Sequence, residues 1–206
     1  MAADDARPRP STSRRRAVAL AREERERRVL DIAAELFYAR GVHEVGMDEL
    51  VRATGLGKAT VYRLFPTKDA LIGAYLERLA KRILSAIDRD IDRHSDDPQG
   101  AVEAIFEAVA ADLARPSFRG CAFNNASIEF PDPEHPARAA ARAYRTALRD
   151  RLTQLAERAR PSEGEQVGAQ LALVLDGMYV NAAHLGPNGP AAAGPALALA
   201  VLGDPR

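Results

Sequence analysis

Four side chains that can bind a polyanion lie close together in the first third of the chain. They offer one ammonium group, two hydroxyls and one guanidinium, on Lys58, Thr60, Tyr62 and Arg63. Ammonium and hydroxyl groups commonly contact phosphate oxygens, whereas a guanidinium can bind O6 and N7 of guanine together. Apolar residues recur between them at helical spacing, which predicts a short helix over Lys58–Leu64. The polar side of that helix would be free to meet nucleic acid.

The residues on either side of this helix predict how it is held. Met47–Thr54 has apolar residues on one helical face, and Gly55 can adopt the left-handed conformation that ends a helix abruptly. Pro66 ends the second helix, and Thr67 can cap the long helix that follows. Two short helices joined in this way form a helix-turn-helix, whose second helix enters the DNA major groove.

The segment GLGKATVYRLFPTKDAL, residues 55–71, resembles the hallmark sequence of the TetR (tetracycline-repressor-like) family of transcriptional regulators. The resemblance is close over residues 22–82 and beyond them concerns only the number and length of helices. It implies contacts with the DNA backbone from Lys58, Thr60, Tyr62 and Lys68, and with bases from Ala59 and Arg63. Two positions depart from the family pattern, because Gly46 and Gly57 stand where a capping Thr and a Ser are usual.

The resemblance also implies the architecture. An all-α, nine-helix chain is expected, with a helix-turn-helix DNA-binding domain over residues 22–67 and a ligand-binding and dimerisation domain over residues 68–206. Apolar periodicity and local start and stop signals predict helices at Arg22–Arg40, Met47–Thr54, Lys58–Leu64, Lys68–Arg93, from Asp97-Pro98 to before Pro116, and at Pro136–Arg160, Glu163–His184 and Ala191–Leu202. The segment Gly120–Phe130 is predicted to be a short helix or an irregular piece. Ser162 and Glu165 are predicted to form a capping box for the eighth helix.

Composition and charge agree with this interpretation. The 206 residues are rich in Ala, Leu, Arg and Glu and include no Trp, which favours an all-α fold. The net charge is zero, but residues 1–82 hold 17 Lys and Arg against 12 Asp and Glu. Only this part is therefore expected to meet a polyanion. The single cysteine and the absence of a signal or spanning segment in the sequence favour a cytoplasmic protein without a membrane partner.

Residues 1–21 are expected to form a disordered, arginine-rich arm. Pro8 and Pro10 and the low hydrophobicity of this stretch disfavour a packed helix. An arm of this kind could lie along phosphates or enter a minor groove, but an ordinary solvated tail would have the same composition.

The second half of the chain contains candidate ligand-binding residues. The stretch GCAFNNASIEF, residues 120–130, combines aromatic side chains with two amides, as small-molecule sites often do. We expect a pocket for an effector of unknown identity among Phe106, Cys121, Phe123, Asn124, Ile128, Tyr144, Asp176 and Tyr179. Each of these could equally be a core side chain, and the asparagines could instead cap or link helices.

The last two helices, from Glu163 onwards, are apolar on nearly every side. A helix of this kind must be buried all round, either within its own subunit or against a second copy. Dimerisation through these helices is what the resemblance implies, and Leu175 and Leu199 are expected to lie in the interface. The sequence thus predicts a homodimeric, ligand-released repressor of a palindromic operator.

An alternative class of function uses the same pocket without regulating DNA. Such a protein would be a helical small-molecule carrier or an enzyme. The four histidines are scattered, and the sequence has no metal-ligand spacing, phosphate-binding loop or paired-carboxylate motif. No catalytic residue, metal site or cofactor is therefore predicted.

Overall fold

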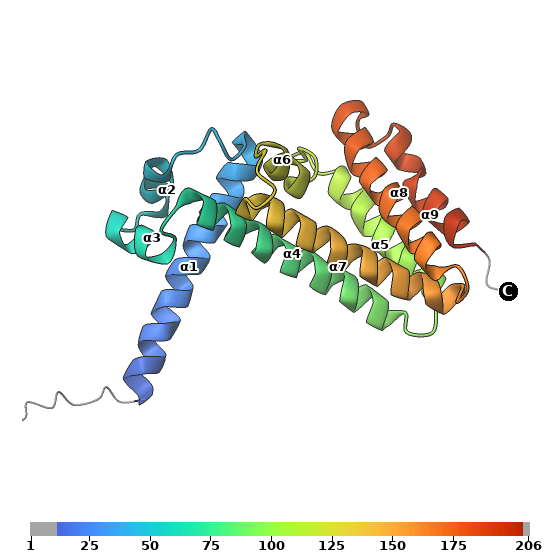
Figure 1. Cartoon of the computed structure of the whole chain (residues 1–206), viewed down its shortest axis with the longest axis horizontal. Coiled ribbons are helices and arrows are strands. Elements are labelled where there is room, and N and C mark those ends of the chain that lie inside the picture. The colour runs from blue at the N-terminus through green and yellow to red at the C-terminus, as the bar shows by residue number, and fades with distance from the viewer. Residues whose placement is uncertain (1–11, 204–206) are drawn as a thin grey trace, which may run out of the picture.

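The computed structural model describes residues 12–203, and in that part of the chain every regular element is helical (Figure 1). The elements are α1 Thr12–Arg40, α2 Met47–Thr54, α3 Lys58–Leu64, α4 Lys68–Arg93, α5 Pro98–Leu113, α6 Ala122–Ile128, α7 Pro136–Ala159, α8 Gly164–Leu185, the 3-10 turn η1 Pro190–Ala193, and α9 Gly194–Leu202. The predicted all-α class and the nine predicted helices are confirmed for the described residues.

Helices α1, α2 and α3 form a small headpiece at one end of the molecule (Figure 1). Its core is built from the inner faces predicted by periodicity, with Phe37, Leu50, Val61 and Phe65 all buried. Gly55 ends α2 with φ +66°, and its N–H donates to the carbonyl of Arg52. A side chain at Gly55 would be strained in this left-handed conformation, so glycine is required for the abrupt turn into α3.

Helices α4 and α7 run side by side and in the same direction from the headpiece to the far end (Figure 1). Near their starts, His135 Nε2 lies 3.3 Å from Asp69 Oδ1. Further along, the guanidinium of Arg151 binds both carboxylate oxygens of Asp88, at 2.6 and 2.9 Å. Because the pair is bidentate, it fixes the register of the two helices in addition to attracting them electrostatically. Helix α4 is therefore held to α7 near its start and again towards its far end.

Helices α8 and α9 close the bundle at the end remote from the headpiece (Figure 1). Helix α8 lies against α7 at two glycines, Gly164 and Gly168, where an added Cβ would come within 3 Å of the backbone of Glu157 or Thr153. The absence of a side chain at these positions lets the two helices approach closely. Helix α9 then packs on α8 and α5.

Two expectations about helix starts were wrong. Helix α1 begins at Thr12 and not at Arg22, so residues 12–21 are helical and no break separates them from the headpiece. The last helix-breaking residue is Pro10, and the stretch that follows is made of good helix formers such as Arg, Ala and Leu. The remainder of the predicted arm, residues 1–11, lies outside the described residues.

The predicted capping box of α8 is also absent. Glu163 and not Ser162 is the N-cap, and it makes no side-chain cap hydrogen bond. The chain enters α8 through a turn closed by the Glu163 N–H and the Arg160 carbonyl, 3.0 Å apart, which shifts the start of the helix by one residue.

Candidate functional site

The outer side of α3 holds the residues predicted to meet DNA. Lys58, Ala59 and Arg63 are exposed, whereas Thr60 and Tyr62 are half-buried on the flanks of the helix. Lys68, the first residue of α4, is also half-buried and donates from Nζ to the carbonyl of His43 at 3.3 Å. The structure therefore brings all six predicted residues to the headpiece, with five of them on one short helix.

The N-termini of α2 and α3 have the glycine caps that the sequence indicated. Gly46 and Gly57 are both in extended conformations, and neither end has a side-chain cap hydrogen bond. A β-carbon at either position would meet nothing within 4 Å. The space that a Ser or Thr would occupy is therefore open.

The two cations of α3 have different surroundings. Lys58 Nζ lies 2.8 Å from Asp48 Oδ1, and this hydrogen-bonded ion pair lowers the pKa of Asp48 and raises that of Lys58. The same ammonium lies 5.7 Å from the ring centroid of Tyr62. Arg63 makes no ion pair or side-chain hydrogen bond within the described part of the chain. Its guanidinium is thus available to a base edge without breaking an existing contact.

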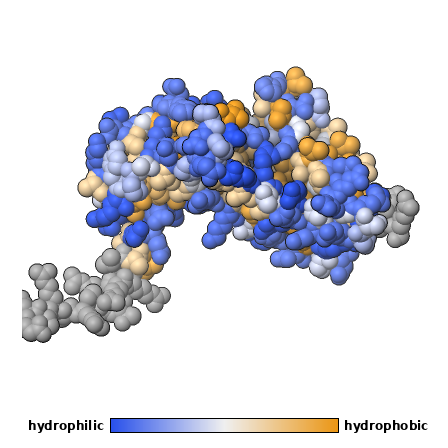
Figure 2. Space-filling view, in the orientation of Figure 1, coloured by the Kyte–Doolittle hydropathy of each residue, from blue (hydrophilic) through white to orange (hydrophobic). Residues whose placement is uncertain are grey.

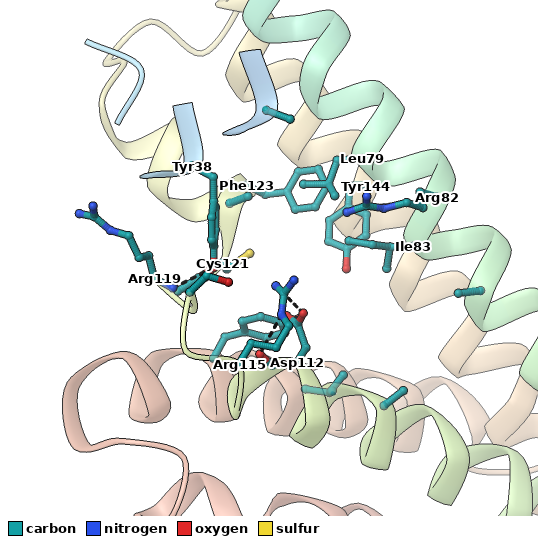
Figure 3. A pocket seen from close by; sticks show the side chains of 18 of the residues that line it. Tyr38, Leu79, Arg82, Ile83, Asp112, Arg115, Arg119, Cys121, Phe123 and Tyr144 are labelled. Atoms are coloured by element: carbon teal, nitrogen blue, oxygen red, sulfur yellow. Dashed lines mark hydrogen bonds and ion pairs between the residues drawn. The ribbon is translucent and has the colours of Figure 1, made fainter. Parts of the chain in front are cut away.

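A cavity of about 820 Å³ lies between the headpiece helix α1 and helices α4–α8 (Figure 3). Four of the predicted ligand-binding residues line it, namely Cys121, Phe123, Tyr144 and Tyr179. Phe123 and Tyr144 stack face to face, with ring centroids 3.9 Å apart and planes inclined by 8°. The cavity has the size and the aromatic walls of a small-molecule site.

The other four predicted ligand-binding residues do not line the cavity. Phe106 lies in the core, and Ile128 is 79% exposed at the end of α6. Asn124 and Asp176 both hold Arg145, whose guanidinium donates to Asn124 Oδ1 at 2.6 Å and forms an ion pair with Asp176. Periodicity alone could not distinguish these cases, since it predicts which face of a helix is buried but not whether a buried side chain lines a cavity, packs in the core or holds another side chain.

The sequence analysis missed the contributions of α4 and α1. Tyr75, Leu79, Ile83 and Ile87 recur every four residues along α4 and line the cavity together. This regular stripe was the signal that could have identified them. Tyr38 of α1 gave no such signal, because its role depends on a distant loop.

Tyr38 joins the headpiece to the loop before α6 at the cavity wall (Figure 3). Its hydroxyl donates to the Gly120 carbonyl at 3.1 Å and accepts from the Arg119 N–H at 2.8 Å. The wall of the cavity is therefore continuous from the headpiece to the bundle.

Burial controls the titratable groups inside the cavity. It raises the pKa of the phenols of Tyr75, Tyr144 and Tyr179 well above the ordinary value of 10.0. It also raises the pKa of the Cys121 thiol. All four groups are therefore protonated near neutral pH, and Cys121 has the character of a thiol and not of a reactive thiolate.

Comparison with known proteins identifies the family. The model of the family described as "Bacterial regulatory proteins, tetR family" matches residues 29–75, from the middle of α1 to the first part of α4. A TetR-family transcriptional regulator from Streptomyces coelicolor has 32% identical residues and a TM-score of 0.81, with 87% of this chain and 95% of that one covered. The chain belongs to the TetR family. NemR of Escherichia coli in its reduced form has a TM-score of 0.77 but only 18% identity over 85% of this chain and 95% of that one, so it shows the TetR fold alone.

Relatives of known activity regulate transcription in both directions. The HTH-type transcriptional activator FasR of Mycolicibacterium smegmatis is 35% identical over 107 residues, which are 50% of this chain and 49% of FasR. The chain thus spans about half the length of that relative. An HTH-type transcriptional repressor of Mycobacterium tuberculosis is 26% identical over 165 residues, 80% of this chain and 74% of the repressor. None of these names belongs to an enzyme.

Residues 12–203 contain neither a membrane-spanning helix nor a cluster of potential metal ligands. No helix in this range is long and apolar enough to cross a membrane. Within the same range, no group of three or more His, Cys, Asp or Glu side chains is placed to hold a metal ion.

Proposed function

We propose that this TetR-family protein is a ligand-released repressor that binds a palindromic operator as a homodimer. The observation that carries the proposal is the α3 surface, where an unpaired guanidinium at Arg63 is flanked by the phosphate-binding groups of Lys58, Thr60 and Tyr62. A helix that presents its polar side in this way fits the major groove, with flanking residues on the backbone.

The proposed dimer face is the outer side of α8 and α9. Leu173, Val180 and Leu197 are 69%, 50% and 50% exposed, and a β-carbon at Gly177 would meet open space. Positions 173, 177 and 180 lie on one face of α8. Figure 2 has hydrophobic surface over this end of the molecule, which is the end remote from the headpiece. A second copy related by a two-fold axis would cover it.

The centre of this proposed face differs from the sequence prediction. Leu175 is only 4% exposed and lines the cavity, so it faces the interior of its own subunit. Leu199 is half-buried against the core. Some apolar residues of α8 and α9 therefore pack in the core of the subunit, and others lie on the proposed dimer face.

The proposed coupling between ligand and DNA runs through the cavity wall. A ligand there would touch Tyr38 on α1 and Tyr75 on α4 at once, and both helices belong to or enter the headpiece. Helix α6 supplies a second route, because Phe123 lines the cavity and Glu129, just beyond the helix, accepts the N–H groups of Val42 and His43 at 3.2 and 3.1 Å. A ligand shifts DNA affinity only by its differential affinity for the two states, and DNA must weaken the ligand by the same factor.

Selection of bound sequences from a random pool of duplexes tests the proposal. A two-fold symmetric site should be enriched, with half-sites about one helical turn or a multiple of it apart. A carrier or enzyme that uses the same cavity without regulating DNA would enrich no sequence, and that outcome would overturn the proposal. The selected operator then serves as the probe for ligands that release the protein.

A further inference from the structure

Two buried hydroxyls in the cavity have no hydrogen-bond partner in the described part of the chain. Tyr75 on α4 and Tyr144 on α7 are 5% and 8% exposed and both line the cavity. Neither hydroxyl donates to or accepts from a group in residues 12–203. No buried side-chain oxygen or nitrogen in that range is both enclosed and unpaired, so both hydroxyls face the open space of the cavity. A ligand that offers hydrogen-bond acceptors would satisfy them.

The third phenol of the cavity, Tyr179, already makes a hydrogen bond within the protein. Tyr179 donates to Asp112 Oδ2 at 3.0 Å, and the other carboxylate oxygen of Asp112 lies 2.7 Å from the guanidinium of Arg115. The charge of Asp112 is therefore compensated by Arg115, and its other oxygen is satisfied by Tyr179. The charge of Asp90 is compensated by one partner, the guanidinium of Arg93 at 2.9 Å.

The basic groups at the mouth are less fully compensated. Arg82 lines the cavity and is exposed, and it forms no ion pair within the described residues. Figure 3 shows its side chain extending from α4 over the cavity, whereas the guanidinium of Arg119 points away. Its positive charge acts on the Tyr75 phenol, whose pKa it lowers against the larger effect of burial. Glu35, on the α1 side of the mouth, is the one lining acid in residues 12–203 without a cationic partner.

The rest of the wall is apolar and partly flat. The ring of Phe123 stacks on that of Tyr144, and the apolar side chains of Ile87, Ile105 and Leu175 also line the cavity. An apolar ligand body would therefore be stabilised here in proportion to the apolar surface that it removes from water.

We propose that the cavity binds an amphipathic organic anion. Its apolar, ring-containing body lies against Phe123 and Tyr144, and its acidic group lies at the mouth, where the Arg82 guanidinium and the Tyr75 hydroxyl bind it. The proposal deepens the proposed function, on which it rests, by naming the chemical class of the effector. A cation is less favoured than an anion, because Asp90 and Asp112 already have basic partners and Glu35 is then the one lining acid in residues 12–203 left to pair with it.

A pair of fluorescent probes that share one ring system tests the charge preference. 8-Anilinonaphthalene-1-sulfonate is an anion, and N-phenyl-1-naphthylamine is the same skeleton without the sulfonate. The full chain should bind the sulfonate about fivefold more tightly, the scale of a half-exposed ion pair joined by one hydrogen bond. The preference should fall as salt is raised, because an exposed pair is screened. The neutral probe should not respond to salt in this way.

Variants assign the preference to its residues. Arg82→Gln should abolish the preference for the sulfonate and leave the affinity for the neutral probe unchanged. Tyr75→Phe should reduce the preference for the sulfonate. Arg89→Gln is the matched control, since Arg89 is exposed on the same helix and does not line the cavity. Ala86→Trp, which fills the cavity, should remove the binding of both probes.

Several outcomes would overturn the proposal. These are equal affinity for the two probes, a preference that survives Arg82→Gln, or binding that survives Ala86→Trp. Weak or absent binding of both probes by the unaltered chain would do the same. Operator binding by the same preparations separates the two claims: a failed charge preference with a selected operator rejects only the ligand class. A retained charge preference without an operator rejects only the regulatory function.

Discussion

Arg63 has no acidic partner among residues 12–203, whereas Lys58, on the same helix, is held by Asp48. In the proposed complex, Lys58 would give up the Asp48 carboxylate to bind a DNA phosphate. Arg63 would bind a base without losing a contact within the protein. Arg63→Ala should therefore cost about 1–3 kcal/mol on the selected operator and relax the choice at one base pair in each half-site. Competition binding against operator variants measures both effects.

Tyr62→Phe provides the control for this assignment. If its hydroxyl contacts phosphate, the substitution should weaken all sequences alike, since phosphate contacts carry no base preference. An unchanged base preference in Arg63→Ala would show that another residue reads the sequence.

The buried phenols predict how stability depends on alkaline pH. Burial raises the pKa of Tyr75, Tyr144 and Tyr179 above the unfolded value near 10.0. In alkali the unfolded chain therefore releases protons that the folded chain keeps. The stabilisation from these groups is complete below pH ~10 and is lost as pH rises beyond it. Urea unfolding at several pH values should show this fall.

One phenol can be removed to check the origin of the fall. Tyr144→Phe should make the slope shallower by about one proton, or ~1.4 kcal/mol per pH unit above pH ~10. The part of the tyrosinate absorbance that comes from Tyr75, Tyr144 and Tyr179 should rise with unfolding and not before it. Full ionisation of all the tyrosines in the folded protein would contradict the burial of these three.

Among the helices, those whose ends carry local signals were predictable from the sequence. The bounds of α2, α3 and α4 follow from Gly55, Pro66 and Thr67, and the Thr67 hydroxyl indeed accepts the Ala70 N–H at 3.1 Å. The start of α1 was missed because composition was averaged over a stretch in which only the first part contains proline. An average over residues 1–21 does not show that the composition changes after Pro10.

The cavity was only half predictable, because its wall is made by contacts between distant elements. Asn124 and Asp176 have the chemistry of ligand-binding groups, yet Arg145 holds both of them. Tyr38 lies next to Arg119 and Gly120 only after folding. One sequence shows which side chains can bind a ligand but not which of them the fold has already paired.

The close approach of α7 and α8 gives a prediction at the level of elements. A β-carbon at Gly168 would lie 2.5 Å from Thr153 Cα, whereas the three atoms nearest to one at Gly194 all belong to the side chain of Met178. A backbone cannot move aside, but a methionine side chain can. Gly168→Ala should therefore destabilise the fold by about 1–3 kcal/mol, as overpacking of a core does. Gly194→Ala should cost much less.

Denaturant unfolding of the two variants measures the difference. Both glycines lie at contacts of α8, so the comparison isolates what the added methyl group meets. Equal losses, or a stabilised Gly168→Ala protein, would mean that α7 and α8 are not as close as the structure has them.

At the scale of the whole molecule, the proposed dimer sets the distance between the two α3 helices. Leu173 is exposed on the outer face of α8 and makes no essential contribution to the core of its own subunit. Leu173→Arg should place a charge in an apolar interface without a partner and so separate the subunits. Because the side chain is exposed in the single subunit, the fold should survive. Sedimentation velocity measures the mass, and circular dichroism confirms the helices.

Ile128→Arg is the matched control, since Ile128 is also an exposed, large apolar residue but lies outside α8 and α9. Its mass and operator affinity should not change. The Leu173→Arg monomer should lose most of its affinity for the full palindrome, because one headpiece then holds only one half-site and the second contact is no longer intramolecular. Its weak binding to a single half-site should persist, since Arg63 and the other α3 groups lie at the opposite end of the molecule. A Leu173→Arg protein that sediments as the unaltered one does, and binds the palindrome equally well, would move the dimer interface away from this face.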